Sequence, residues 1–257
     1  MNHAADKPVL DELPMTRDIR KWPSFVAGAV MAAVVVGGPP ADTVRAQEES
    51  EKAALVQRIS DAAAAVSEIM SAGDKAIPRA VLENAEAIAV FPRMPRPRVR
   101  RGQGPNTLRT VRALGIRGRG ILSVRGEQGA WSPPAFLSVL GGTFPPDADL
   151  VLVIMKGRGL ENVMRIEFKI DADAAVAAGP LNSVAQASTG AQIFSYLRSR
   201  GVLAGVSLNG STLQQDAEAN RRFYAKPLTA RQAVGQADGP APVAVWRAAL
   251  EKHVRGR

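Results

Sequence analysis

The sequence predicts an α+β fold, in which a mostly antiparallel, strongly curved sheet or barrel is flanked by helices from both ends of the chain. One observation is an amphipathic helical repeat with apolar residues at spacings of four and three: Leu55, Ile59, Ala62, Val66 and Ile69. A second is a set of short apolar runs typical of strands: residues 121–125, 136–140 and 150–155. The third is strict alternation over residues 165–170, which puts Ile166, Phe168 and Ile170 on one buried face of an antiparallel sheet.

The chain between these runs yields further elements. Pro78 suits the first turn of a short helix that reaches about Glu86, and residues 87–91 then continue as a strand. Residues 202–208 form a short apolar run bounded by glycine, which predicts a buried strand. The Asn209-Gly210 pair then supplies a tight turn into a return strand over residues 211–213.

The periodicity changes again after this turn. Asp216 is a suitable helix cap, and Asn220, Phe223 and Tyr224 follow at spacings that place them on one helical face. A short amphipathic helix is therefore predicted from Asp216 onward.

The composition limits the class of protein. The 257 residues allow one large domain or two small ones, and the 46% hydrophobic content is enough for a sizeable core. The absence of cysteine excludes disulfides and thiolate chemistry. The net charge is +9, and residues 92–119 contain nine arginines and no acid, so the rest of the chain sums to zero.

Residues 1–46 have the order of a secretory signal peptide. Basic residues precede an apolar run over 25–38, and small residues up to Ala46 follow it. The run is shorter than the roughly 20 residues that a transmembrane helix needs. We therefore expect an exported protein, periplasmic or secreted, with Met1 or Met15 as its start; an uncleaved N-terminal anchor is the alternative.

The two ends of the mature chain are expected to be helical. The acidic excess of the helical segment 47–79 favours packing on the chain's own domain over contact with an anionic membrane. Residues 235–257 read as a Gly/Pro/Ala linker and a tail, in which a short helix carries Trp246 and Leu250 on one face. This tail helix is expected to pack loosely or to fray.

The sequence carries no catalytic signature. The mature chain has a single histidine, His253, and there is no nucleophile elbow, phosphate loop or metal-ligand spacing. Hydrolysis by two carboxylates alone is not excluded, although no pattern in the sequence brings two such residues together. We therefore expect a non-enzymatic protein without cofactor or metal.

Spaced motifs over residues 80–234 resemble the SYLF domain, a lipid-binding module of bacterial envelope proteins and of eukaryotic actin-patch and membrane-traffic proteins. Its opening is matched by Leu82–Ala85 and Ile88–Pro92. The later matching positions are Trp131, Ser132, Pro134, Gly179, Pro180, Tyr196, Gly201, Gly205, Gly210, Asp216, Asn220, Phe223 and Tyr224. The resemblance implies an exported bacterial member of the family that binds phospholipid. The bound head groups would be of the phosphoinositide type or otherwise anionic. We expect these positions to be mainly structural, with Trp131 anchored in the core.

Residues 92–119 depart from this family, which has a glycine-rich, apolar hairpin there. Three interpretations of these arginines are open. They belong to a basic loop that contacts lipid phosphates, to a solvated disordered insertion, or to a stretch of the gene that is read out of frame. Under the first interpretation the lipid-binding candidates are Arg96, Arg98, Arg100, Arg101, Arg119 and Arg125. The run lacks stacking aromatics, so nucleic acid is not an expected partner.

These observations converge on a non-enzymatic cell-envelope protein that binds anionic phospholipid or a membrane surface. The alternative is a structural or adhesion-type protein that binds another protein through a sheet edge or exposed glycines, without lipid recognition.

Overall fold

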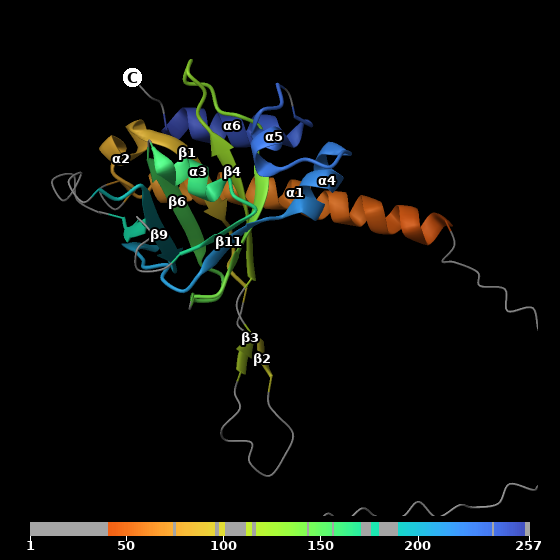
Figure 1. Cartoon of the computed structure of the whole chain (residues 1–257), viewed down its shortest axis with the longest axis horizontal. Helices are drawn as coiled ribbons and strands as arrows, with labels where there is room; N and C mark the ends of the chain where they lie inside the picture. Colours follow the sequence, from red (N-terminus) through yellow and green to blue (C-terminus); the bar gives the residue numbers. More distant parts are fainter. Residues whose placement is uncertain are drawn as a thin grey trace, which may run out of the picture. The chain divides into compact units, whose positions relative to one another are not determined.

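A nine-stranded sheet forms the centre of the structure, a computed structural model (Figure 1). It describes residues 41–73, 76–95, 98–100, 112–114, 117–142, 144–155, 157–170, 176–179, 190–237 and 239–254. The strands of this sheet are β1 (Ala85–Phe91), β4 (Arg117–Val124), β5 (Ala135–Leu140), β6 (Asp149–Met155), β7 (Glu167–Lys169), β8 (Val176–Ala178), β9 (Ile193–Ser199), β10 (Val202–Gly205) and β11 (Thr212–Gln215). Two more strands, β2 (Arg98–Arg100) and β3 (Arg112–Leu114), pair with each other in a separate two-stranded sheet.

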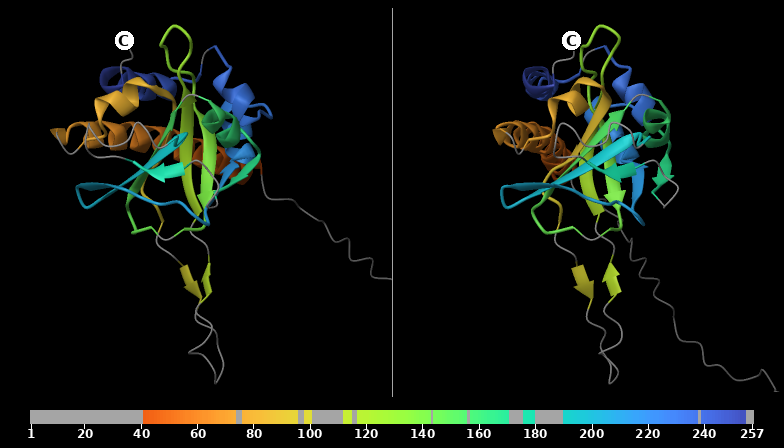
Figure 2. Two further views of the ribbon diagram at one scale, coloured as in Figure 1. Left: turned by 60° about the vertical axis from the view of Figure 1, so that its left-hand side comes forward. Right: turned by 90° about the vertical axis from the view of Figure 1, so that its left-hand side faces the viewer.

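The large sheet is almost entirely antiparallel. Its strand order is β10-β9-β6-β1-β4-β5-β11-β7, and every neighbouring pair along this path is antiparallel. β8 alone is parallel, against the first half of β9. The sheet curls strongly (Figure 2), so the predicted α+β fold with a curved antiparallel sheet is confirmed.

Six helices are present in the described part of the chain, and none of them is both long and apolar enough to cross a bilayer. They are α1 (Ala41–Met70), α2 (Arg79–Glu83), α3 (Arg158–Val163), α4 (Ala217–Tyr224), α5 (Ala230–Val234) and α6 (Pro242–His253). Figure 2 shows α1 and α6 on one side of the sheet and α3 and α5 on the other.

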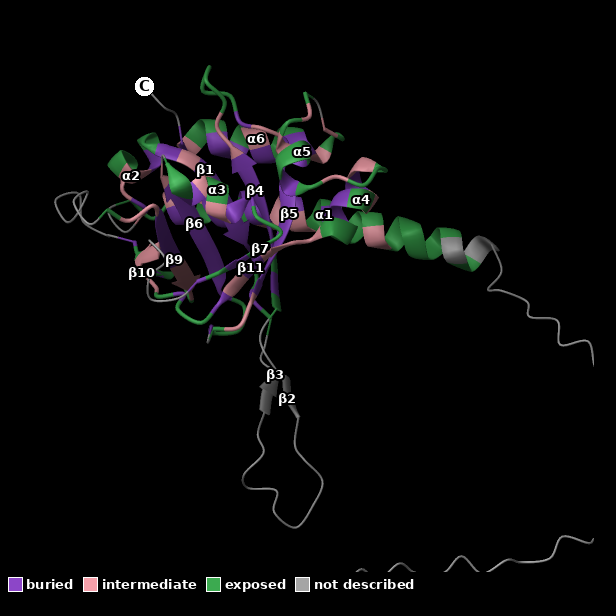
Figure 3. Cartoon of the chain, in the orientation of Figure 1, coloured by how far each residue is buried: buried purple, intermediate pink, exposed green. Residues whose placement is uncertain are grey.

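The central strands are buried on both faces because each face has its own core. In β1, Ile88 and Val90 join the core beneath α1 and α6, whereas Ala87, Ala89 and Phe91 join the core on the opposite face. Successive side chains of a strand point to opposite faces, which explains why such strands read as continuous apolar runs. Figure 3 shows this burial along the strands of the sheet.

The C-terminal helix packs firmly, so the expectation of a loose tail is wrong. Trp246 and Leu250 of α6 are fully buried against α1, and the Trp246 Nε1 donates a hydrogen bond of 2.7 Å to the Ser123 Oγ. The sequence of the predicted ten-residue tail helix indicated that one of its faces is apolar. It could not show that the sheet leaves room beside α1 for a second helix.

Two strand predictions also need correction. The apolar run over residues 202–208 forms a strand only from Val202 to Gly205, and Val202 is 66% exposed. The chain does turn at Asn209-Gly210, where Gly210 has a φ of 80°. The next strand, β11, pairs with β5 and β7 instead of returning along β10.

The alternation over residues 165–170 is correct for two of its three apolar residues. Phe168 and Ile170 are buried, whereas Ile166 is 79% exposed. The strand β7 begins only at Glu167, after a turn that follows α3. The Ile166 carbonyl oxygen still accepts a hydrogen bond of 3.0 Å from the Gln215 N–H, so its side chain is exposed at the end of the β7–β11 ladder.

His253, in the last turn of α6, predicts an acid-sensitive contribution to stability. Its pKa lies below the ordinary 6.5, because burial disfavours the charged form and Lys252 repels it. As the pH falls through 6.5, the unfolded chain binds the proton first, so the folded state loses stability on the acid side. We expect the thermal midpoint of His253→Gln to fall less than that of the wild type between about pH 7 and about pH 5. Parallel pH profiles would contradict this prediction.

Candidate functional site

The arginine-rich segment 92–119 leaves the large sheet after β1 and returns to it at β4. Within it, Arg98 and Arg100 belong to β2, and Arg100 lies opposite Arg112 of β3 in the two-stranded ladder. Arg96 and Arg101 lie outside the described residues. The segment thus contains a short antiparallel pair of strands, which none of the three interpretations of the sequence included.

Two arginines at the start of β4 continue the basic segment onto the sheet. Arg117 and Arg119 are exposed and alternate with the buried Gly118 and Gly120. A Cβ at Gly120 would lie 2.4 Å from the Val90 carbonyl oxygen, so glycine is needed for this close approach of β4 to β1. The exposed Arg117 and Arg119 therefore belong to a strand whose main chain packs closely on β1.

Acidic residues anchor the other end of the segment. The Arg93 N–H donates to the Asp149 Oδ1 at 3.0 Å, and the Arg93 guanidinium pairs with Asp61 of α1 at 3.2 Å. The second Asp149 oxygen accepts hydrogen bonds of 3.0 and 2.7 Å from Arg198 of β9. Asp149 is 6% exposed. These acids are therefore engaged at the base of the segment.

Arg125, another lipid-binding candidate, lies at the other end of β4. Six residues of extended strand, about 20 Å, separate it from Arg119. Its guanidinium stacks over the buried Trp131 ring at 4.8 Å and donates to the carbonyl oxygens of Leu82, Glu83 and Val254 at 2.9–3.0 Å. Burial lowers its pKa. The structure does not bring Arg125 together with the basic segment, and it gives this side chain internal partners from α2 and the end of α6.

The Trp131 motif is anchored through its neighbours. The Ser132 Oγ accepts a hydrogen bond of 3.0 Å from the Val124 N–H, and the Pro134 carbonyl oxygen accepts one of 2.6 Å from the Tyr224 hydroxyl. Trp131 itself is 2% exposed, as predicted for a core anchor.

Gly179 packs against the fully buried Tyr196, and Gly205 packs against Gly179. A Cβ at Gly179 would lie 2.1 Å from the Tyr196 ring, and one at Gly205 would lie 2.5 Å from the Gly179 carbonyl oxygen. Gly201 and Gly210 instead occupy turns. Pro180 lies outside the described residues.

The Asp216 helix forms as predicted. The Asp216 Oδ1 accepts a hydrogen bond of 3.2 Å from the Ala219 N–H, and its Oδ2 pairs with Arg58 of α1 at 3.2 Å. Asn220 and Phe223 are buried, and Tyr224 is partly buried. These motif residues join α4 to β5 and α1.

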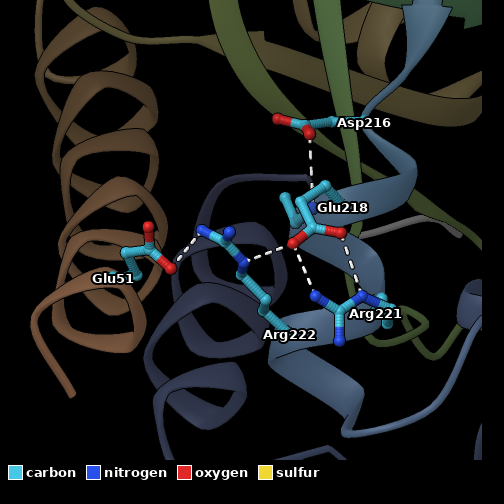
Figure 4. Close-up of polar contacts among 6 residues, drawn as sticks. Glu51, Asp216, Glu218, Arg221 and Arg222 are labelled. Carbon is cyan, nitrogen blue, oxygen red and sulfur yellow. Dashed lines mark hydrogen bonds and ion pairs between the residues drawn. The ribbon is translucent and has the colours of Figure 1, made fainter. Parts of the chain in front are cut away.

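A second charged cluster joins α4 to the N-terminal half of α1 (Figure 4). Arg222 pairs with Glu51 of α1 and, at 2.6 Å, with Glu218, while Arg221 also pairs with Glu218 at 2.6 Å. These hydrogen bonds, first that of Arg221, lower the pKa of Glu218 to about 2. The cluster borders an open hollow of about 450 Å³ lined by Arg45, Glu48, Glu49, Glu51, Lys52, Arg221, Arg222 and Ala225.

The two charged regions have different chemical capacities. The arginines of the α1–α4 cluster are neutralised by nearby glutamates, whereas the segment 92–119 contains no acid. Only the segment therefore offers an excess of cations suited to phosphate groups. Among the described residues, no group of three or more His, Asp or Glu side chains lies close enough to hold a metal ion.

Sequence reasoning missed Asp61, Asp149 and Arg198, because they are distant in sequence and become neighbours only through the sheet. The pairing of Glu218 with Arg222 was readable from their spacing of four residues on a helix.

Comparisons with known proteins identify the domain. The Ysc84 family model, described as "Las17-binding protein actin regulator", matches residues 146–253. The human SH3 domain-containing YSC84-like protein 1 is 36% identical over 124 residues, which cover 44% of this chain and 36% of the human protein. The rat protein of the same name is 31% identical over 167 residues, covering 61% of this chain and 45% of its own.

A yeast relative is similar over a comparable stretch. LAS seventeen-binding protein 3 of Saccharomyces cerevisiae is 29% identical over 140 residues, which cover 50% of this chain and 30% of the yeast protein. The chain thus spans less than half the length of these relatives, and no solved structure matches it significantly. The family match and these relatives agree, and residues 146–253 therefore carry a domain of the Ysc84 (SYLF) family.

Proposed function

We propose that this protein binds anionic phospholipid head groups without catalysing a reaction, and that the arginine-rich segment 92–119 makes the contact. The observation that carries the proposal is the concentration of nine arginines without an acid in that segment. Exposed arginines near an anionic surface contribute up to about 1 kcal/mol each, so a handful is enough for membrane attachment. The exposed Arg117 and Arg119 extend the same charge onto β4.

The structure gives a physical reason to prefer this segment over the other cations. Arg125 and Arg222 are already engaged by carbonyl oxygens and carboxylates within the protein. Freeing them for a lipid phosphate would first break those contacts. In the segment, Arg93 is engaged in the same way by Asp61 and Asp149, whereas Arg117 and Arg119 are exposed and the segment itself contains no acid.

The second candidate is a protein partner without lipid recognition. The names of the family and of the yeast relative describe binding to Las17, and this favours a protein-binding role for the shared domain. Salt separates the two candidates, because exposed charges are screened over about 8 Å at physiological ionic strength whereas apolar contacts are not.

Export to the periplasm or the exterior is part of the proposal, with removal of residues 1–46 as a signal peptide. Expression in a bacterial host followed by mass determination of the mature protein tests it. A mature N-terminus at Gln47 supports export with cleavage, and an intact N-terminus in the membrane fraction supports the anchored alternative.

Vesicle co-sedimentation of the full chain tests the lipid proposal. We expect binding to vesicles that contain phosphatidylserine or phosphoinositide, no binding to phosphatidylcholine alone, and a loss of binding at high salt. Changing Arg96, Arg98, Arg100 and Arg101 to serine should weaken binding by about tenfold or more, because it removes four of the contacts.

A charge-matched variant controls for net charge. It changes four exposed cations elsewhere, Arg158, Arg165, Arg231 and Lys252, to serine, and it should bind nearly as well as the wild type. Equal loss in both variants would mean that only net charge matters. Failure of the folded wild type to bind any anionic vesicle would overturn the lipid function and leave the protein partner.

A further inference from the structure

The strand β10 leaves one side of the large sheet open from Val202 to Ala204, whereas Gly179, after β8, packs against Gly205 at its end. It stands at the end of the strand order and pairs with β9, and no described strand pairs with its other side. Such an edge presents unpaired main-chain donors and acceptors, and these can template another strand.

The ladder shows which groups face outward. The Val206 N–H donates to the Ser195 carbonyl oxygen at 3.2 Å, and this pair continues the β10–β9 register. In an antiparallel ladder, facing residues alternate between pairs that exchange hydrogen bonds and pairs that do not. The main-chain groups of Val202 and Ala204 therefore face β9, and those of Leu203 point away from it.

This edge lacks most of the features that normally block strand addition. Natural edges are protected by short length, charged side chains, proline or bulges, and of these β10 has only its length of four residues. The other end of the sheet, β7, places the exposed, charged Glu167 and Lys169 on either side of Phe168. β10 is Val-Leu-Ala-Gly, without charge or proline, and its Val202 is 66% exposed.

We propose that β10 binds an extended segment of a partner protein, which adds to the sheet as a further strand. Main-chain hydrogen bonds to Leu203 would supply affinity, and the exposed Val202 and Ala204 would select small or β-branched residues opposite them. The exposed Arg200, in the turn before β10, favours an acidic residue at that end of the segment.

The length of β10 argues for a peptide segment over a second copy of the chain. A stable dimer buries roughly 1,200–2,000 Å² in total. Four edge residues supply only a small part of that area, whereas short strand-addition motifs bind through edges of this kind. This proposal is independent of lipid binding, because β10 lies outside the segment 92–119.

The experiment selects peptides from a random peptide library on the immobilised full chain and measures the affinity of the selected peptide. Val202→Lys protects the edge with a charge and should weaken that peptide by about tenfold or more. Val245→Lys is the matched control, since Val245 is another valine, 56% exposed, on α6. It should leave peptide affinity unchanged.

Hydrogen exchange with and without the peptide locates the site. We expect β10 amides to exchange readily in the free protein and to become protected in the complex. Slow exchange of Leu203 in the free protein, protection elsewhere, no selected peptide, or equal effects of both lysine variants would each overturn the proposal. Self-association of the wild type that Val202→Lys abolishes would also overturn it, by showing a second copy at this edge.

Discussion

Replacing Trp246 by alanine is expected to lower the free energy of unfolding by about 3–5 kcal/mol, the range measured for large aromatic residues in cores. The side chain is fully buried between α6, α1 and the sheet, and its Nε1 donates to the Ser123 Oγ at 2.7 Å. The substitution therefore creates a cavity and removes a buried hydrogen bond. Urea unfolding followed by circular dichroism measures the change.

Two further variants separate these causes. Trp246→Phe removes the Nε1 donor but keeps most of the volume, so its cost should be smaller, about 1–2 kcal/mol. Val245→Ala, at the exposed neighbouring position, should stay within about 0.5 kcal/mol of the wild type. If Trp246→Ala proved as mild as Val245→Ala, α6 would be loosely attached in solution, as its sequence alone suggested.

Asn220→Ala is expected to cost about 1–3 kcal/mol, because it leaves the buried Phe136 N–H without a partner. The Phe136 N–H donates to the Asn220 Oδ1 at 2.9 Å, and the Asn220 Nδ2 donates to the Phe136 carbonyl oxygen at 3.1 Å. The Phe136 carbonyl oxygen also accepts a hydrogen bond of 3.0 Å from the Asp216 N–H at the end of β11, so the Phe136 N–H is the group whose hydrogen-bond partner is Asn220. Thermal and urea unfolding of the variant test this role.

Asn84→Ala is the matched control. Its Nδ2 also donates to a main-chain carbonyl, that of Ala80, at 2.8 Å, but the amide is exposed. Water can replace that hydrogen bond, so the loss should stay within about 0.5 kcal/mol. Similar losses in the two variants would show that burial does not set the cost at Asn220.

Local patterns in the sequence predicted the elements whose partners lie close along the chain. The repeat through Leu55 and Ile59 gave α1, the capping potential of Asp216 gave α4, and Trp131 was placed correctly in the core. In each case one helix face or one side chain determines the outcome. The same local patterns located β4, β5 and β6 within a few residues.

Contacts between distant segments decided the rest. No local pattern shows that β11 inserts between β5 and β7, or that Trp246 enters the core beside α1. The charged network has the same origin, since Asp149 contacts Arg93 and Arg198 from a third part of the chain. For the candidate site, the sequence located the basic segment, and the structure separated Arg125 from it.

The packing of α1 against α6 also bears on when the domain closes during synthesis. These helices are the first and last of the described elements, and they share one core. All nine strands of the large sheet leave the ribosome before α6, so the apolar surface that receives Trp246 stays uncovered until about residue 253 has emerged. Long-range closure of this kind slows folding, because the loop entropy is lost before the contacts form. Although α1 is synthesised early, we therefore expect the nascent chain to stay incompletely folded, and to bind chaperones, until α6 has emerged.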